Sequence, residues 1–543
     1  MTEGAVSGDG RALYVQGLLA LRDGDAQEAA ALLIRALRRQ PNHHGIRRNL
    51  VRAFLVSERF EQVLIQANAA LSTAPDDAEL HFARGTALNA VGQHALACAA
   101  FARALALQPD HAPSWLNMAN ASVDLDDLAS AESLYRTAIR LDAAFMEAHT
   151  SLAHILTLQG RLDEAIASCE TAIRLCPGAV QPHWNLAIAT LLSGNLSRGF
   201  LEYEWRRRHP RYRASFPDIA GPAWDGSDPA GQTILVRAEQ GFGDVIQFAR
   251  YLPLLLAAGG KPILLCARAL VPLIRSMPGV TAISPSDPAP AYDLWIDQIS
   301  LPQRFGTTLE TIPSGGGYLA ADPSRVRDWH ARLTAMRYQA VADRSLPEWT
   351  HPGSCAPDRA LPAGVPDLGV ADLGVAQAGV AQAGVAQSGT AEAGTGEIRQ
   401  RTIGIALTGN PKHRADRHRS IPADLDVTLP RIQGVSYVNL EHGRAERCLG
   451  LPDLTRWMTD YAETAALVAN LDLVITVDTS IAHLAGALGK PVWILLPHAP
   501  DWRWLLKRRD SPWYWSARLF RQPAPGDWTS VLAQVTRELF LIR

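Results

Sequence analysis

Residues 471–497, LDLVITVDTSIAHLAGALGKPVWILLP, decide the fold class of the second half of the chain. They begin with an apolar run rich in β-branched residues, 473–477, which predicts a buried strand. After a polar turn, apolar residues recur at the 3.6-residue period of a helix, which Gly489 and Pro491 end. The apolar residues 492–496 predict the next strand. The stretch therefore indicates the strand, turn, helix and strand of a parallel α/β sheet.

The polar turn in this stretch is a predicted anion site. Asp478, Thr479 and Ser480 lie where the helix begins, and there backbone N–H groups and the helix dipole favour negative charge. His483 falls on the first turn of the helix. A histidine at such a place either packs as a structural residue or donates to a phosphate. A diphosphate is the group that we expect here.

Composition excludes several classes of function. Lysine plus arginine, 52 residues, nearly balance aspartate plus glutamate, 54 residues, so a general nucleic-acid-binding role is not indicated. No apolar run approaches the roughly 18–20 residues of a membrane span, and the N-terminus does not resemble a signal peptide. The six cysteines form no CxxC pair, which favours reduced thiols over metal ligands and a cytoplasmic location.

The first 200 residues contain an internal repeat. Pro41, Pro75 and Pro109 are spaced 34 residues apart, and Pro177 keeps the same register. Alanines recur in register with them, as expected where paired helices cross closely. This pattern resembles the tetratricopeptide repeat, and we assign an all-helical solenoid to residues 10–206. Such a solenoid either binds a protein partner on its concave surface, which we favour, or is a structural extension.

The next part of the chain alternates strands with helices, which predicts a parallel sheet with right-handed crossovers. We assign residues 207–339 to a first α/β domain. Its predicted elements are strands at 233–238, 262–266 and 292–296 and helices at 245–258 and 270–274.

The loop after the first of these strands contains Gly241, Gly243 and Asp244. A dinucleotide-binding fingerprint requires a glycine three positions after Gly243, but Ile246 stands there, which argues against a nicotinamide enzyme. Asp244 either caps the following helix or points into a cleft as a general base. Glu239 is a rival carboxylate, for which stabilising the loop is the favoured role.

Residues 340–399 interrupt the α/β pattern. Within them glycine recurs every five residues from 364 to 389 among small residues without aromatics, which predicts a disordered low-complexity insert. Strand and helix patterns return in residues 400–543, which we assign to a second α/β domain with a tail. Its further predicted elements are strands at 403–407 and 435–440 and a helix at 464–468.

A basic loop follows the first strand of this second domain. It begins with Gly409 and Asn410 and continues with Lys412, Arg414 and Arg417. A charged loop is often only a solvated surface, but this one follows a strand and a Gly-Asn-Pro turn, which favours phosphate binding.

The tail is rich in tryptophan, with six of the fourteen tryptophans of the chain. They form either a wall over a ligand or the packing between two domains. The six are Trp493, Trp502, Trp504, Trp513, Trp515 and Trp528.

Several long motifs, taken together, resemble those of a known family. The combination is similar to bacterial tetratricopeptide-repeat glycosyltransferases, whose catalytic part is related to the lipopolysaccharide heptosyltransferases of glycosyltransferase family 9. The motifs are LVRAEQGFGDVIQFARYLPLL (235–255), IGIALTGNPKHRADRHRSIP (403–422), DLVITVDTSIAHLAGALGKPVWILLP (472–497), DWRWLL (501–506) and SPWYWSARLFRQ (511–522).

This resemblance implies a fold, a reaction and roles for single residues. It implies the GT-B fold, in which two Rossmann-like domains enclose the active site, and an enzyme that needs no metal and no cofactor. Residues 207–339 would then form the Rossmann-like domain on the acceptor side, and residues 400–543 the Rossmann-like domain that binds the nucleotide sugar. A sugar, of hexose or heptose type, would move with inversion from a nucleotide-diphosphate sugar to an acceptor hydroxyl. It implies that Asp244 is the base. It also implies a set of residues at the donor diphosphate: Lys412, Asp478, Thr479, Ser480 and His483.

The favoured hypothesis is therefore an inverting glycosyltransferase. Its repeats would recruit a partner protein or the acceptor, which could be a glycan, a lipid-linked saccharide or a protein. The alternative is a non-catalytic interaction protein, in which the repeats act and the GT-B-like module only binds a nucleotide. A dinucleotide oxidoreductase is disfavoured by Ile246.

Overall fold

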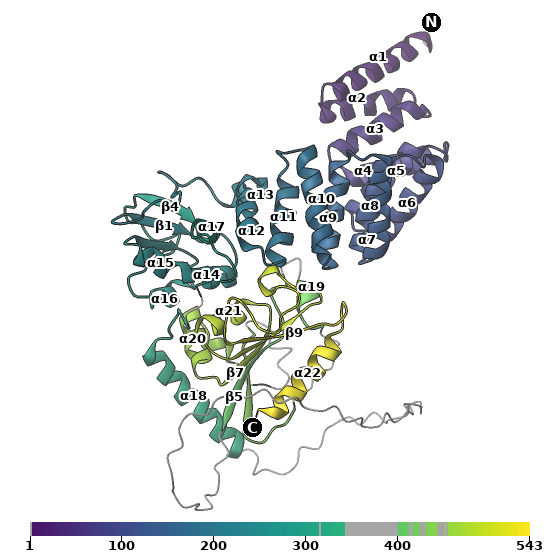
Figure 1. Cartoon of the computed structure of the whole chain (residues 1–543). Coiled ribbons are helices and arrows are strands. Elements are labelled where there is room, and N and C mark those ends of the chain that lie inside the picture. The colour runs from purple at the N-terminus through teal and green to yellow at the C-terminus, as the bar shows by residue number, and fades with distance from the viewer. Residues whose placement is uncertain are drawn as a thin grey trace, which may run out of the picture.

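The chain forms a helical arm followed by two α/β units (Figure 1). From the predicted insert only 340–342 are placed, and Lys412 and Arg414 also lie outside the described residues. The computed structural model describes residues 3–313, 316–342, 400–411, 416–422, 425, 430–441, 451 and 454–542 of the 543.

The arm consists of consecutive helix pairs, which confirms the predicted solenoid of repeats. Small residues lie where the two helices of a pair cross. A Cβ atom on Gly85 would be 2.7 Å from the ring of Phe101, and one on Gly17 would be 2.8 Å from Leu33. The helices of the arm are α1 (Glu3–Arg22), α2 (Ala26–Arg39), α3 (His44–Val56), α4 (Phe60–Leu71), α5 (Ala78–Ala90), α6 (His94–Leu107), α7 (Ala112–Asp124), α8 (Leu128–Leu141), α9 (Met146–Leu158), α10 (Leu162–Leu175), α11 (Val180–Leu192) and α12 (Leu196–Tyr203).

The first α/β unit contains a parallel sheet with the order β3-β2-β1-β4. The predicted helix 245–258 is wrong as a single helix, because Pro253 has no N–H to continue its ladder. The chain instead forms two short helices around a 3₁₀ turn. The elements are η1 (Glu204–Arg208), α13 (Pro210–Ser215), β1 (Thr233–Arg237), α14 (Phe242–Phe248), η2 (Ala249–Tyr251), α15 (Leu252–Ala257), β2 (Lys261–Leu265), α16 (Val271–Ile274), β3 (Thr281–Ile283), β4 (Leu294–Asp297), η3 (Gln298–Ser300) and α17 (Leu301–Arg304). The next helix, α18 (Pro323–Ala342), lies against the second unit, where Trp329 Nε1 donates to Glu463 at 2.9 Å.

The second unit contains a parallel sheet with the order β6-β5-β7-β8-β9. The predicted strand, turn, helix and strand of residues 471–497 are confirmed as β7, α21 and β8, which are buried almost throughout. The elements are β5 (Arg401–Ala406), α19 (Asp416–Arg419), β6 (Val435–Asn439), η6 (Thr455–Trp457), α20 (Tyr461–Ala469), β7 (Leu473–Val477), α21 (Ser480–Ala487), β8 (Val492–Leu496), η7 (Trp502–Trp504), β9 (Ala517–Arg521) and α22 (Trp528–Leu541).

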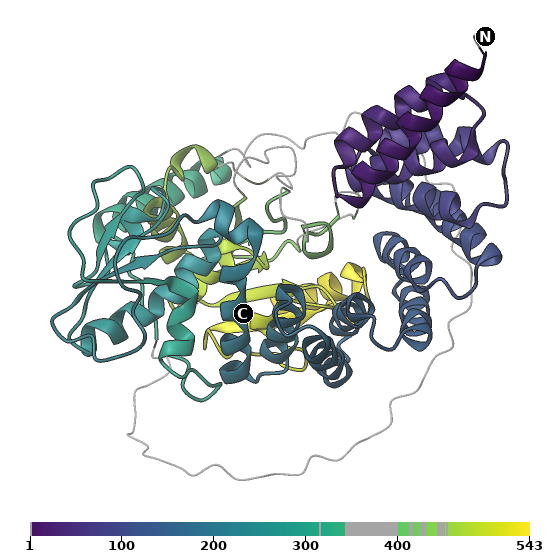
Figure 2. The same cartoon turned by 90° about the horizontal axis from the view of Figure 1, so that it is seen from above.

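The last helices of the arm contact both units. Phe200 of α12 packs edge-on against Phe248 of the first unit, with ring centroids 6.4 Å apart, and against Trp502 of the second, at 5.6 Å. The N-terminal helices of the arm, purple in Figure 2, project away from both units. None of the helices in the described ranges combines the length and hydropathy that a membrane crossing needs.

Candidate active site

The two predicted site loops lie at equivalent places in the two sheets. In the first unit the strand order reverses between β1 and β4, and in the second it reverses between β5 and β7. Ligands of open parallel sheets bind at the carboxyl ends of the strands beside such a switch point. The loop 238–241 follows β1, and Asp478 follows β7. Both loops therefore lie where the topology favours a ligand.

These loops meet each other directly. A Cβ atom on Gly243 would be 2.6 Å from His483 Cδ2 and 3.5 Å from the Cα atom of Ser480. His483 is buried, so the start of α14 lies against the start of α21 with no space for a side chain between them. The structure thus brings the Gly-Phe-Gly-Asp loop and the Asp478–His483 segment together across the boundary of the two units.

We expect Gly243→Ala to destabilise the protein by about 1–3 kcal/mol, as overpacking of a buried contact usually does. The added methyl group must displace the buried His483 ring. The shift of the thermal unfolding midpoint measures the effect. Gly178→Ala is the control, because a Cβ atom there would meet nothing within 4 Å. Equal stability of the two variants would contradict this close approach.

Asp244 lies in the first turn of α14 and points toward the second unit. Its side chain is 21% exposed, and its Oδ1 atom accepts a hydrogen bond from Arg503 Nη2. Burial raises the pKa of Asp244, the charge of Arg503 opposes this rise, and Asp501 adds to it. The pKa of Asp244 lies above its ordinary value, which makes this carboxylate a better proton acceptor than an exposed aspartate.

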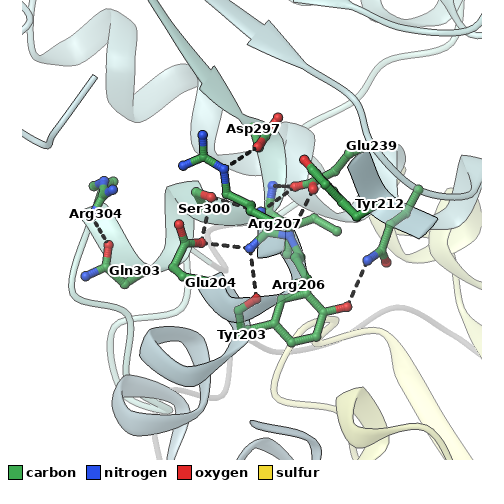
Figure 3. Close-up of polar contacts among 12 residues, drawn as sticks. Tyr203, Glu204, Arg206, Arg207, Tyr212, Glu239, Asp297, Ser300, Gln303 and Arg304 are labelled. Carbon is green, nitrogen blue, oxygen red and sulfur yellow. Dashed lines mark hydrogen bonds and ion pairs between the residues drawn. The ribbon is translucent and has the colours of Figure 1, made fainter. Parts of the chain in front are cut away.

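Glu239, the rival carboxylate, is held in a buried ion cluster (Figure 3). Arg206, which follows the last helix of the arm, donates from Nε and Nη2 to its two oxygens at 2.9 and 2.6 Å. The backbone N–H of Ile299 donates to Oε1 at 3.1 Å. Because both oxygens are occupied, Glu239 fixes the loop to the arm instead of serving as a base. Next to it, Gln240 donates to the hydroxyl of Tyr203 at 2.8 Å.

The start of α21 presents hydroxyl groups. Thr479 is its N-cap and accepts a hydrogen bond from the N–H of Ile481 at 3.3 Å. The hydroxyl of Tyr461 donates to Ser480 Oγ at 2.6 Å. Since Ser480 Oγ accepts from Tyr461, its own hydroxyl hydrogen is available to donate to a ligand.

Asp478 and His483 are both close to electrically neutral below about pH 6. Burial, reinforced by the charge of Asp501, raises the pKa of Asp478 to about 6. Burial, reinforced by the charge of Arg503, lowers the pKa of His483 well below its usual value. His483 Nδ1 is 2.8 Å from the hydroxyl of Tyr514, and its Nε2 is 3.9 Å from Asp478 Oδ1. Below about pH 6 these two side chains therefore offer hydrogen bonds to a ligand without a fixed charge.

The raised pKa of Asp478 predicts a pH-dependent stability. Between about pH 4 and pH 6 the unfolded chain releases the Asp478 proton while the folded chain keeps it, so stability falls as pH rises. Above this window the loss is complete. We expect the stability of Asp478→Asn relative to wild type to increase from pH 4 to pH 6 and then to stay constant. Thermal unfolding at a series of pH values measures this stability difference. Asp218→Asn, at an exposed position, is the control. Parallel stability profiles for wild type and the Asp478→Asn variant would disprove the raised pKa of Asp478.

Arg419, at the described end of the basic loop, acts on Asp478. The charge of Arg419 acts to lower the pKa of Asp478, opposing its burial. The N–H of Gly409 donates to Ser420 Oγ at 2.8 Å, and a Cβ atom on Gly409 would clash with Asp416 and Arg419. The loop therefore folds back over a glycine. Asn410 lies within this loop, and Arg417 lies in α19.

Arg503 is the main site residue that the sequence analysis did not select. Its side chain is 8% exposed and contacts Asp244 and Asp501. The sequence feature that could have pointed to Arg503 is its place between two tryptophans in the motif DWRWLL. Among the described residues, no group of three or more histidine, cysteine or acidic side chains is placed to hold a metal ion.

Two tryptophans of the tail pack between parts of the molecule. Trp502, Trp504 and Trp513 are buried, and Trp513 packs edge-on against Phe248 of the first unit at 6.0 Å. The ring of Trp504 stacks on His483 with centroids 5.5 Å apart. Of the two roles that the sequence left open, Trp502, which packs against Phe200 of the arm, and Trp513 take domain packing.

Comparison with known proteins gives three segment matches. Tetratricopeptide-repeat models match residues 20–84 and 116–180. The model of glycosyltransferase family 9 (heptosyltransferase) matches residues 458–496, which run from α20 through β8 and include the start of α21. The chain resembles a tetratricopeptide-repeat glycosyltransferase with a family 9 region. The family 9 region thus contains the Asp478–His483 half of the site, and repeats joined to such a region indicate a glycosyltransferase.

One relative is similar along most of the chain. Protein FlbA of Caulobacter vibrioides is 25% identical over 499 residues, which are 86% of this chain and 73% of FlbA. Two solved structures have a partial likeness. A thermophilic TPR protein of Thermus thermophilus is 22% identical, with a TM-score of 0.30, over 34% of this chain and 99% of its own. The pilF protein of Pseudomonas aeruginosa is 15% identical, with a TM-score of 0.34, over 38% and 93%.

Proposed function

We propose that this protein is an inverting glycosyltransferase that moves a sugar from a nucleotide-diphosphate sugar to an acceptor hydroxyl. One observation carries the proposal: the Asp244 loop and the Asp478–His483 segment are in contact, and both lie at the carboxyl ends of strands beside the switch points. A base and an anion site that face each other in this way fit a displacement at the anomeric carbon.

Asp244 is the base in this proposal. It accepts the proton of the acceptor hydroxyl while that oxygen forms its bond to the anomeric carbon. The bond from the anomeric carbon to the diphosphate oxygen breaks, and its electron pair leaves with the nucleoside diphosphate. The burial that raises the pKa of Asp244 favours this proton transfer, and Glu239 is excluded because Arg206 occupies both its oxygens.

The start of α21 holds the leaving diphosphate. Ser480 donates its hydroxyl hydrogen, and the first backbone N–H groups of the helix favour an anion. A diphosphate beside Asp478 would raise the pKa of that residue further, so that its carboxyl group donates a hydrogen bond instead of repelling the phosphate. Lys412 and Arg414 supply positive charge from the basic loop, in keeping with the resemblance. No metal and no cofactor enters the proposed reaction.

The arm recruits the acceptor or a partner protein. The first helices of successive pairs, α3, α5 and α7, line a cavity of about 540 Å³ together with the end of α6. Its walls combine apolar side chains such as Leu55 and Phe82 with the basic Arg48 and Arg52. Successive repeats commonly form an extended binding surface of this kind. A protein, a lipid-linked saccharide and a glycan are the acceptor classes to test, and a cytoplasmic location is the one we expect.

A panel of nucleoside-diphosphate sugars tests the proposal. A ligand that binds only the folded state stabilises it, by about 2.7 kcal/mol at 100 times its Kd, so the matched donor raises the unfolding midpoint. The same donor should be turned over, which is measured as release of nucleoside diphosphate with and without acceptor. Binding without release in the presence of each acceptor class would instead support a non-catalytic interaction protein.

A further inference from the structure

Arg503 connects the two halves of the site. It belongs to η7 of the second unit, and its guanidinium group reaches α14 of the first. There Nη2 donates to Asp244 Oδ1, and Nε donates to Gln247 Oε1 at 2.6 Å. Asp244 and Gln247 are three residues apart and thus share one face of α14. One side chain therefore fixes two positions of the helix that carries the proposed base.

Arg503 is itself held rigidly in its own unit. Asp501 Oδ1 accepts from Nη1 at 2.8 Å and from the backbone N–H at 3.0 Å. The guanidinium carbon is 4.3 Å from the ring centroid of Trp502. All three guanidinium nitrogens are engaged in this planar arrangement, which a lysine cannot reproduce. Leu505 has a φ of +50°, in the left-handed region that leucine disfavours, so the backbone beside Arg503 is strained, as is common at functional sites.

Arg503 also influences the charge state of Asp244, together with the other charged and titratable groups around it. Tyr203 approaches from α12, Asp501 and Arg503 from η7, and His483 from α21. Burial and Asp501 raise the pKa of Asp244, whereas Arg503 lowers it. His483 is neutral because its pKa is well below the usual value. Arg503 is therefore the neighbouring cation that favours the carboxylate form.

We propose that Arg503 is a positioning residue for the sugar transfer: it holds the Asp244 carboxylate ionised and oriented toward the acceptor hydroxyl. This inference rests on the proposed function, since it needs Asp244 as the base. The guanidinium remains charged when Asp244 takes the proton, so no proton passes through Arg503. Gln247, buried and bonded to the same guanidinium, sets its orientation.

Arg503→Met tests the charge without any substrate. The carboxylic-acid C=O band of Asp244 is identified in infrared difference spectra as the band that Asp244→Asn removes. In the Arg503→Met variant this band should titrate about 1–3 pH units higher than in wild type, because the neighbouring cation is gone. Arg508→Met is the control and should leave the band unchanged, since Arg508 belongs to the same segment, is 37% exposed and pairs with Asp510. An unchanged titration in the Arg503→Met variant would overturn the inference.

Kinetics with the donor found in the panel separates positioning from a structural role. The acid limb of the kcat/KM profile should move to higher pH in the Arg503→Met variant, and free guanidinium should restore part of the lost rate. Arg503→Lys keeps a charge and covers the case in which Arg503→Met fails to fold. It should keep the acid limb of wild type but lose at least tenfold in kcat, since an ammonium cannot bond Asp244, Gln247 and Asp501 in one plane. An Arg503→Lys enzyme with the kcat of wild type would refute the positioning role.

The experiments distinguish a failure of the Asp244 assignment from a failure of the Arg503 assignment. An active Asp244→Asn enzyme would disprove the proposed role of Asp244 as the base and, with it, this inference. If Asp244→Asn is inactive but the pH profile of kcat/KM is unshifted in Arg503→Met, only the proposed role of Arg503 is disproved.

Discussion

Asp244→Asn lowers the kcat for sugar transfer by about 10²–10⁴-fold, the range that a positioned general base contributes. The asparagine keeps the shape of the side chain and an oxygen for Arg503, but it cannot take a proton from the acceptor. Because the folded state raises the pKa of Asp244, its ionised form is disfavoured there, so the variant should be at least as stable as wild type near pH 7. Release of nucleoside diphosphate and the unfolding midpoint measure the two effects.

Asp218→Asn is the matched control for this experiment. Asp218 is an exposed aspartate in the sequence of the same unit, so its replacement should change neither kcat nor the midpoint. The decisive observation is the ratio of the two kcat values. Equal kcat values for the Asp244→Asn and Asp218→Asn variants would show that Asp244 is not the base.

Arg206→Met should destabilise the first α/β unit by about 3–5 kcal/mol, because it leaves buried carboxylates without their cation. The side chain of Glu239 is fully buried, and its two oxygens depend on Arg206. Arg206 also donates to Glu204 at 2.8 Å and to Ser300 at 2.9 Å. The loss should appear as a lower unfolding midpoint and as faster proteolysis near the junction of arm and unit.

Two further variants make this prediction specific. Arg208→Met removes a neighbouring exposed arginine, which lies 4.1 Å from the ring centroid of Trp205, and should change stability by no more than about 0.5 kcal/mol. The double variant Arg206→Met/Glu239→Leu removes both charges and should recover part of the loss. If Arg206→Met and Arg208→Met unfold at the same midpoint, the cluster does not join the arm to the unit.

The strands β7 and β8 were predictable because they are short, buried and almost entirely apolar. They agree with the predicted runs 473–477 and 492–496. β3 and β9 were missed. β3 has three residues, and β9 contains Arg518 and Arg521, so neither forms a long continuous apolar run. The helix α22 was also missed, although Asp527 caps it by accepting from the N–H of Ser530, a signal present in the sequence.

The candidate site was predictable only where its residues lie in the turn after a strand or in the first helical turn that follows it. Asp244 and Asp478 could be found because the carboxyl ends of parallel strands lie at one edge of a sheet. Arg503 could not be paired with Asp244, since 259 residues separate them and nothing local in the sequence records the contact. The position of Tyr203 beside this loop could not be predicted either, because its contact with Gln240 depends on how the arm packs against the first unit.

The contacts of Phe200 with both units have a consequence for how an acceptor arrives. Because α12 is packed against Phe248 and Trp502, the arm cannot swing as a tethered module on a flexible linker. A partner bound in the cavity between α3 and α7 is then held at one fixed distance from Asp244. The effective concentration of the acceptor hydroxyl at Asp244 depends on how much of the partner's chain separates that hydroxyl from the segment bound to the arm. It is highest when this length of chain just spans the distance from the cavity to Asp244. If the arm recruits the acceptor as proposed, it sets this distance, and shortening or lengthening the partner should change which hydroxyl receives the sugar.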